Sequence, residues 1–215
     1  MNRAAVLFDC DGVIVDSEPI TDRVIAANLT RHGLAVAPQE VHRLFVGGTM
    51  ASVGDYASRH GAQLPADWLS AIYAEIFDEL AKGTPLVPGI GTVFDALDRA
   101  GIPFAVGSNG PHAKMAVTLG QHPEILSRLR HRVFSREDVA RPKPAPDLYL
   151  HAARALDAHP SRTAVIEDSA TGIRAARAAG MQAFGYAPDG GGANLAAEGA
   201  HVFHRMADLP ALLGL

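Results

Sequence analysis

The chain begins with a short apolar run that ends in two acidic residues, because residues 4–12 read AAVLFDCDG. An apolar run of this length, closed by polar residues, is typical of a buried strand. Asp9 and Asp11 then lie in the loop that follows the strand, and Gly12 marks a turn. The stretch predicts a first buried strand that delivers two carboxylates to its carboxyl end.

The pattern on either side of residue 85 differs. Residues 17–84 predict helices and no convincing strand, with helices over 17–32, 38–45, 49–60 and 65–82. From residue 85 onward, strands alternate with helices, which implies a parallel sheet covered on both faces. The strands are predicted over 102–106, 131–134, 163–166, 182–185 and 201–203, and the helices over 91–100, from 111, and over 146–156, 170–179 and 209–213.

These patterns predict an α/β fold with two domains. The core is a Rossmann-like parallel sheet built from residues 1–16 and 85–215. An α-helical cap domain, residues 17–84, is inserted after the first strand.

Composition excludes several classes of protein. The 215 residues are 48% hydrophobic and 20% charged, so the chain is not of the disordered type. The formal net charge of −4 argues against a nucleic-acid partner. No apolar run approaches the roughly 20 residues of a membrane-spanning helix. The lone Cys10 and the absence of a signal-peptide pattern lead us to expect a cytoplasmic protein.

Polar loops follow three of the predicted strands. They are Asp9 to Gly12, Ser108-Asn109-Gly110 and Glu167-Asp168-Ser169. Ligands of open parallel sheets bind at the carboxyl ends of the strands, so these loops predict one site. Its carboxylates would repel one another without a hard cation such as Mg²⁺. Lys143, between two prolines, adds a positive charge suited to a phosphoryl group, in a chain where only three of 19 basic residues are Lys.

The same residues resemble a known family. The stretch Asp9-Cys10-Asp11-Gly12-Val13 resembles the first motif of the haloacid dehalogenase-superfamily phosphatases. Ser108-Asn109-Gly110, Lys143 and Glu167-Asp168-Ser169 with Gly172 resemble its later motifs, in the family's order. The helical insertion resembles the small cap of the phosphoglycolate phosphatase and β-phosphoglucomutase group. Residues 106–115, which include Lys114-Met115, resemble a subgroup that acts on phosphogluconate-type substrates.

The resemblance implies a role for each motif residue. Asp9 is expected to be the nucleophile that forms an aspartyl-phosphate, and Asp11 the general acid and then the general base. Mg²⁺ is expected on the Asp9 carboxylate, the Asp11 carbonyl and the Asp168 carboxylate. Ser108, the Asn109 backbone and Lys143 are expected to bind the phosphate. Glu167 is expected either to support the metal ligands from behind or to bind the metal through a water molecule.

We expect a Mg²⁺-dependent hydrolase of a small phosphorylated metabolite, a sugar phosphate or sugar-acid phosphate, acting as a monomer. A β-phosphoglucomutase-like transferase is the alternative, although Thr21 and Met50 stand where mutases usually carry His and Arg. A non-catalytic phosphate-binding regulatory protein is a further alternative. In the cap, Arg43 and the stretch Gly47-Gly48-Thr49 are the residues expected to select the substrate, because a Gly-Gly turn lets backbone approach a ligand closely.

Overall fold

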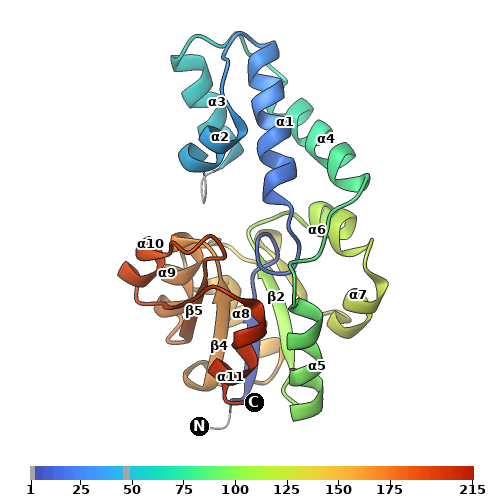
Figure 1. Ribbon diagram of the computed structural model, residues 1–215, viewed down its shortest axis with the longest axis vertical. Helices are drawn as coiled ribbons and strands as arrows, with labels where there is room; N and C mark the ends of the chain where they lie inside the picture. The colour runs from blue at the N-terminus through green and yellow to red at the C-terminus, as the bar shows by residue number, and fades with distance from the viewer. Residues whose placement is uncertain (1–2, 46–48) are drawn as a thin grey trace. The chain divides into compact units, whose positions relative to one another are not determined.

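The structure is a computed structural model, and it describes residues 3–45 and 49–215 (Figure 1). The chain divides into two compact units. One consists of Met1–Asp16 and Leu86–Leu215, and the other is Ser17–Pro85. The first unit contains the sheet, and the second contains helices.

Across the described residues, the sheet has six strands, all parallel, in the order β3-β2-β1-β4-β5-β6. This order reverses direction beside β1, and in such sheets the crevice at the carboxyl ends of the strands is the usual ligand site. The α/β Rossmann-like prediction is confirmed. The strands are β1 (Ala5–Phe8), β2 (Phe104–Ser108), β3 (Val133–Ser135), β4 (Thr163–Glu167), β5 (Gln182–Tyr186) and β6 (His201–Phe203).

Alternate residues of the strands build a hydrophobic layer on each face of the sheet. Phe8 packs with Phe94 and Phe104 in one layer, and Leu7 packs with Tyr149 in the other. Both faces of β1 are therefore buried, which explains its unbroken apolar sequence. The layers are completed by α5 (Ile90–Ala100), α6 (His112–Leu119), α7 (Pro123–Leu129), α8 (Asp147–Ala155), α9 (Ala170–Ala178), α10 (Ala193–Ala197) and α11 (Leu209–Leu213).

The second unit has only helices as regular secondary structure among its described residues. It contains α1 (Glu18–Arg31), α2 (Pro38–Phe45), α3 (Met50–Arg59) and α4 (Trp68–Ala81). A buried hydrogen bond joins α1 to α4, in which Nε1 of Trp68 donates to Oδ1 of Asn28 at 2.7 Å. Gly54 lets α3 approach the same indole ring, because a Cβ there would lie 2.8 Å from it.

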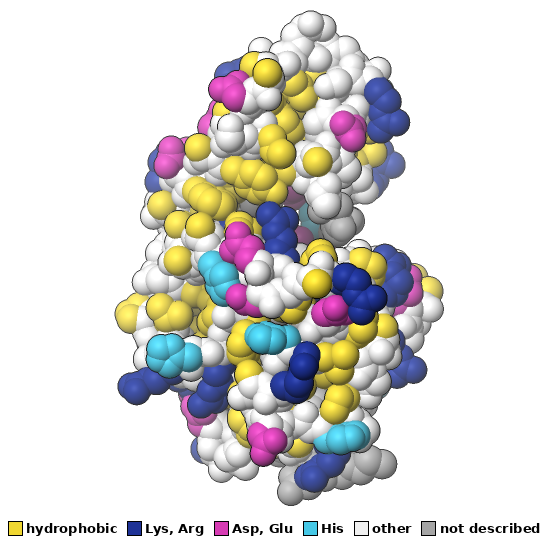
Figure 2. Space-filling model, turned by 180° about the vertical axis from the view of Figure 1, so that it is seen from behind, with side chains coloured by type: hydrophobic (Ala, Val, Ile, Leu, Met, Phe, Trp, Pro, Cys, Tyr) yellow, Lys and Arg dark blue, Asp and Glu magenta, His cyan; other side chains and the backbone are white. Residues whose placement is uncertain are grey.

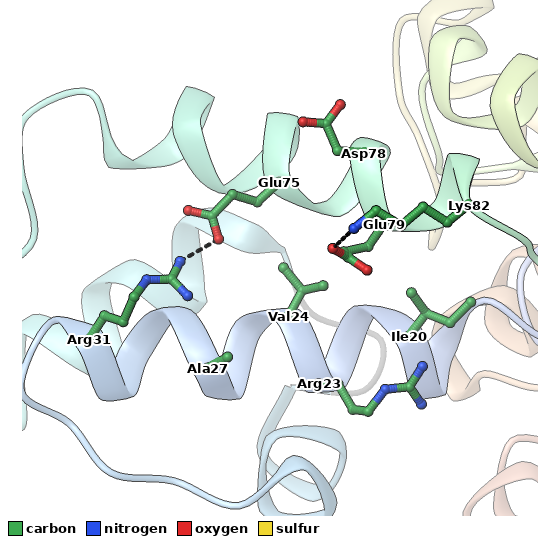
Figure 3. A pocket seen from close by; sticks show the side chains of 9 residues that line it. All are labelled: Ile20, Arg23, Val24, Ala27, Arg31, Glu75, Asp78, Glu79 and Lys82. Carbon is green, nitrogen blue, oxygen red and sulfur yellow. Dashed lines mark hydrogen bonds and ion pairs between the residues drawn. The ribbon is translucent and has the colours of Figure 1, made fainter.

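A groove of about 650 Å³ lies between α1 and α4 (Figure 3). Arg31 pairs with Glu75 across it, and Lys82 pairs with Glu79 along α4. Several of its charged groups are thus engaged with one another. The lining comes from this unit alone, and none of the predicted catalytic residues is among the described residues that form it.

Basic side chains are spread over the surface. Figure 2 shows Lys and Arg side chains scattered among acidic and uncharged ones on the face that it presents. Arg128, from a basic stretch of α7 and the following loop, pairs with Asp95 and Asp98 of α5 and lies over the ring of Phe94. No helix within residues 3–45 or 49–215 is long and apolar enough to cross a membrane.

Candidate active site

Asp9 is placed by the register of the sheet. Phe8 lies opposite Val106 of β2 and Ile166 of β4, and the N–H of Asp9 donates to the carbonyl of Ile166 at 2.9 Å. The residues that follow these three strands therefore meet at one edge. The sequence-predicted loops Ser108-Asn109-Gly110 and Glu167-Asp168-Ser169 belong to that edge.

Lys143 connects two of these strand ends. Its Nζ donates to Oδ1 of Asp9 at 2.6 Å and to Oε1 of Glu167 at 2.7 Å. The Lys143 side chain is 3% exposed, and its ammonium lies 4.6 Å from the centre of the Tyr149 ring. A buried ammonium shared by two carboxylates has its charge compensated and its position fixed.

Asn109 fixes the loop that carries Lys143. Its Nδ2 donates to the Lys143 carbonyl at 3.1 Å, and its Oδ1 accepts from the Lys143 N–H at 3.0 Å. Both polar atoms of the Asn109 amide thus hold the Lys143 loop, which leaves the backbone N–H of Asn109 as the phosphate donor expected from the sequence.

Glu167 is the most heavily hydrogen-bonded carboxylate of the edge. Besides Lys143, it accepts from the Tyr149 hydroxyl at 2.9 Å and from the N–H of Asp168 at 3.0 Å. The N–H and hydroxyl of Ser169 each donate to its Oε2 at 2.9 Å. Glu167 has no exposed surface, and through its bonds to Asp168 and Ser169 the carboxylate organises the loop after β4.

Asp11 faces a different cation. Nζ of Lys114, from α6, lies 2.7 Å from Oδ1 of Asp11, and both side chains retain partial exposure. Ser108 lies close by, and its Oγ accepts from the Gly110 N–H at 2.9 Å. The hydroxyl of Ser135 at the end of β3 donates to the Gly110 carbonyl at 2.8 Å, so β3 also fixes this loop.

The electrostatics of the edge follow from burial and from these pairs. Burial raises the pKa of the Asp9 carboxyl to about 7, against the opposing effect of Lys143. Burial also acts to raise the pKa of Glu167, but Lys143 and Ser169 outweigh it and lower the value. For Lys143 and Lys114, burial lowers the pKa, but the neighbouring carboxylates outweigh it, so both ammonium groups remain charged.

The donors available for a metal are all oxygen atoms. The predicted set is the Asp9 and Asp168 carboxylates with the backbone carbonyl of Asp11. Among the described residues, no three side chains of Asp, Glu, His or Cys gather closely enough to hold a metal by themselves. The four carboxyl groups of the edge outnumber its two ammonium groups. Hard oxygen donors in such an acidic site fit Mg²⁺.

The predicted cap residues belong to the helical unit. Arg43 is exposed on α2 and pairs with Glu40 at 3.3 Å. Thr49 caps α3, where its Oγ1 accepts from the N–H of Ser52 at 3.2 Å. Gly47 and Gly48 lie outside the described residues.

Two residues of the site could not be placed from the sequence. Tyr149, inside α8, has its hydroxyl on Glu167, and its surroundings in the sequence give no sign of that contact. Lys114 entered only through a resemblance, without a role. The scarcity of Lys in this chain, which supported Lys143, applies equally to Lys114.

Comparison with known proteins gives the family. The model of the haloacid dehalogenase-like hydrolases matches residues 4–180. The chain is 32% identical to 6-phosphogluconate phosphatase of Escherichia coli, over 86% of this chain and 83% of that protein. It is 34% identical to hexitol phosphatase A of the same organism, over 84% and 81%.

A solved structure agrees with these relatives. The crystal structure of a hydrolase of this family from Deinococcus radiodurans, with bound phosphate and sodium, is similar to the chain with a TM-score of 0.85 and 34% identity. The similarity covers 99% of this chain and 96% of that one. The chain belongs to the haloacid dehalogenase-like hydrolases, and the resemblance found in its motifs is confirmed.

Proposed function

We propose that the protein is a Mg²⁺-dependent phosphatase that hydrolyses a small phosphorylated metabolite, a sugar phosphate or sugar-acid phosphate, through an aspartyl-phosphate on Asp9. It is an enzyme of the phosphoric monoester hydrolase class. One observation carries the proposal: the buried ammonium of Lys143 bridges Asp9 and Glu167 at the carboxyl end of the sheet. The phosphatase names of the relatives support it.

In the first step, a carboxylate oxygen of Asp9 attacks phosphorus as the bond to the leaving oxygen breaks. Asp11, two residues further along the same loop, gives its proton to the leaving oxygen. Lys143 offsets the negative charge that Asp9 and the phosphoryl group bring together. The result is a phosphoryl group on Asp9 and a released alcohol.

The phosphate oxygens are held by the loop after β2. Because Oγ of Ser108 accepts from Gly110, the Ser108 hydroxyl directs its own hydrogen elsewhere and can donate to phosphate. The backbone N–H of Asn109 is the second donor. In the second step, Asp11 takes a proton from water, the resulting hydroxide attacks phosphorus, and the Asp9 carboxylate is restored.

Mg²⁺ would be held by the carboxylates of Asp9 and Asp168 and the carbonyl of Asp11, and it would supply positive charge that offsets the repulsion of nucleophile and phosphate. Glu167, already occupied by five hydrogen bonds, would act by fixing Lys143 and the backbone of Asp168. It is thus a positioning residue in this proposal.

The cap is proposed to select the substrate through Arg43 and the stretch from Gly47 to Thr49. Arg43 is exposed, and its only ion pair among the described residues is the one with Glu40 on the same helix, so its guanidinium can turn toward a ligand at little cost. Replacing Arg43 by Ala should change the order in which a panel of phosphate esters is preferred. An unchanged order would remove Arg43 from the proposal.

The test of the proposed function is release of inorganic phosphate. Wild type and Asp9→Asn would be assayed on 6-phosphogluconate, hexitol phosphates, phosphoglycolate and p-nitrophenyl phosphate, each with Mg²⁺ and with EDTA. We expect the wild type to release phosphate in the presence of Mg²⁺ and not in EDTA. Turnover of no ester would refute the proposal, and conversion of a hexose 1-phosphate with a bisphosphate primer would then identify the transferase alternative.

A further inference from the structure

Lys114 is a second lysine of the catalytic edge, and the mechanism above does not use it. Its Nζ lies 2.7 Å from Oδ1 of Asp11, and its side chain is 17% exposed. Among the ion pairs of residues 3–45 and 49–215, Asp11 is its one partner, whereas Lys143 is shared by two carboxylates. An ammonium group has three donors, so Lys114 can bind a further acceptor while it keeps Asp11.

The backbone keeps this corner of the site small. A Cβ added to Gly110 would lie 3.2 Å from Oγ of Ser108, 3.5 Å from Oδ2 of Asp11 and 3.7 Å from Cδ of Lys114. Gly110 therefore lies next to the Ser108 hydroxyl, the Asp11 carboxylate and the aliphatic part of the Lys114 side chain. Lys114 contacts Oδ1 of Asp11, while Oδ2 lies on the side of Ser108.

The position of Asp11 locates Lys114 relative to a substrate. In the proposed reaction, Asp11 lies within hydrogen-bond distance of the leaving oxygen. Two successive hydrogen bonds then put the Lys114 ammonium within about 5.5 Å of that oxygen. In the proposed reaction Asp11 serves the leaving oxygen and Asp9 attacks phosphorus. Lys114 therefore pairs with the acid of the leaving group, whereas Lys143 pairs with the nucleophile.

We infer that Lys114 is a specificity-determining residue, and that it selects phosphate monoesters whose alcohol carries a carboxylate one or two carbons from the ester carbon. This assignment rests on the proposed function. A carboxylate at that distance reaches the ammonium and forms a charge-assisted hydrogen bond. A hydroxymethyl group in its place offers the ammonium a weaker, neutral acceptor.

Two matched pairs of esters isolate the carboxylate. Phosphoglycolate and 2-hydroxyethyl phosphate differ only in a carboxylate against a hydroxymethyl group, and so do 3-phosphoglycerate and glycerol 3-phosphate. We expect wild type to favour the carboxylate member of each pair in kcat/KM. In Lys114→Met, that preference should fall about 10- to 100-fold, the range for a hydrogen bond to a charged group. Lys114→Arg should keep most of it.

The control is Lys82→Met, which removes an exposed lysine directly after α4 and should leave every ratio unchanged. A thermal midpoint for each variant excludes unfolding as the cause. An equal loss on both members of a pair would show that Lys114 acts on Asp11 alone and would overturn the inference. Wild-type turnover without preference for the carboxylate member would also overturn it, while the proposed function would stand. Absence of any turnover would refute the proposed function itself.

Discussion

The carboxylate of Glu167 occupies the space that a side chain on Gly172 would need. A Cβ built on Gly172 would lie 1.6 Å from Oε1 and 2.5 Å from Oε2 of Glu167, far inside contact distance. Gly172 lies in the first turn of α9, where its N–H donates to Oγ of Ser169 at 3.0 Å. The glycine of this motif is therefore explained by the buried carboxylate beneath it and not by an unusual backbone angle.

Gly172→Ala should destabilise the protein and abolish turnover. The methyl group would displace Glu167 and break its bonds to Lys143 and Tyr149, for which we expect a loss of about 2–4 kcal/mol in the free energy of unfolding. Gly91→Ala is the control, because a Cβ at Gly91 of α5 meets nothing within 4 Å. Urea denaturation measures both, and equal stability of the two variants would contradict this account of the glycine.

Lys143→Met should cost about 3–5 kcal/mol of stability, because it leaves Asp9 and Glu167 as buried carboxylates without a cation. Adding Glu167→Gln to it removes one of those charges. The double variant should then lose less than the sum of the single variants, by about 1–3 kcal/mol. Denaturation in EDTA measures this coupling, and strictly additive losses would show that the three side chains do not act together.

The fold could be predicted from the sequence because the hydrophobic periodicity, and the Gly and Pro residues that separate the elements, agreed with the tertiary packing. The predicted strands overlap the six strands of the described residues, and β1, buried on both faces, has the uninterrupted apolar run that such burial requires, while β3 and β6 are short and partly exposed. The boundaries moved by a few residues: β2 extends to Ser108, two residues beyond the prediction, because it pairs with β3 up to that point. The short helices α7 and α10 were not predicted, although the equally short α11 was, because five to seven residues give only a weak periodic signal.

For the candidate site, the sequence predicted which motifs take part and their order along the chain, but not which side chains contact one another. Asp9 and Lys143 are far apart in sequence, and only the sheet and the loop held by Asn109 bring them to 2.6 Å. The partner of Asp11 was beyond prediction, because Lys114 reaches it from the first turn of a helix whose start was placed only approximately. Pair contacts of this kind depend on helix rotation, which the residue pattern of one short helix does not determine.

Removal of Mg²⁺ should abolish turnover and lower the thermal midpoint. A cation that binds only the folded state stabilises it by about 2.7 kcal/mol when present at 100 times its dissociation constant. Thermal unfolding of the wild type with EDTA and with added Mg²⁺ measures the shift. Asp168→Asn should lose the shift, because it removes one predicted ligand and leaves the Lys143 bridge in place. A wild-type midpoint that Mg²⁺ does not move would contradict the assigned ligand set.

Asp138, which lies outside the catalytic edge, makes the stability of the protein depend on pH. Its carboxylate accepts from the N–H of Ser135 at 2.8 Å and lies 2.9 Å from Nε2 of His112, so it ties the turn after β3 to the first residue of α6. Burial acts to raise the pKa of Asp138, but these partners outweigh it and hold the value below 3.8. At low pH the unfolded chain therefore binds more protons than the folded chain. The free energy of unfolding then falls as the pH decreases toward and below 3.8.

Asp138→Asn should remove that dependence. At pH 6 the variant should be less stable than wild type by about 1 kcal/mol, the difference between a hydrogen bond to a charged group and one to a neutral group. The difference should shrink below pH 4, because the wild-type carboxylate then becomes protonated and its advantage over the amide is lost. Urea titrations between pH 3 and pH 6 measure it, with Asp55→Asn on the exposed side of α3 as the matched control. A difference that stays constant over this range would show that the bonds of Asp138 stabilise the turn independently of its charge.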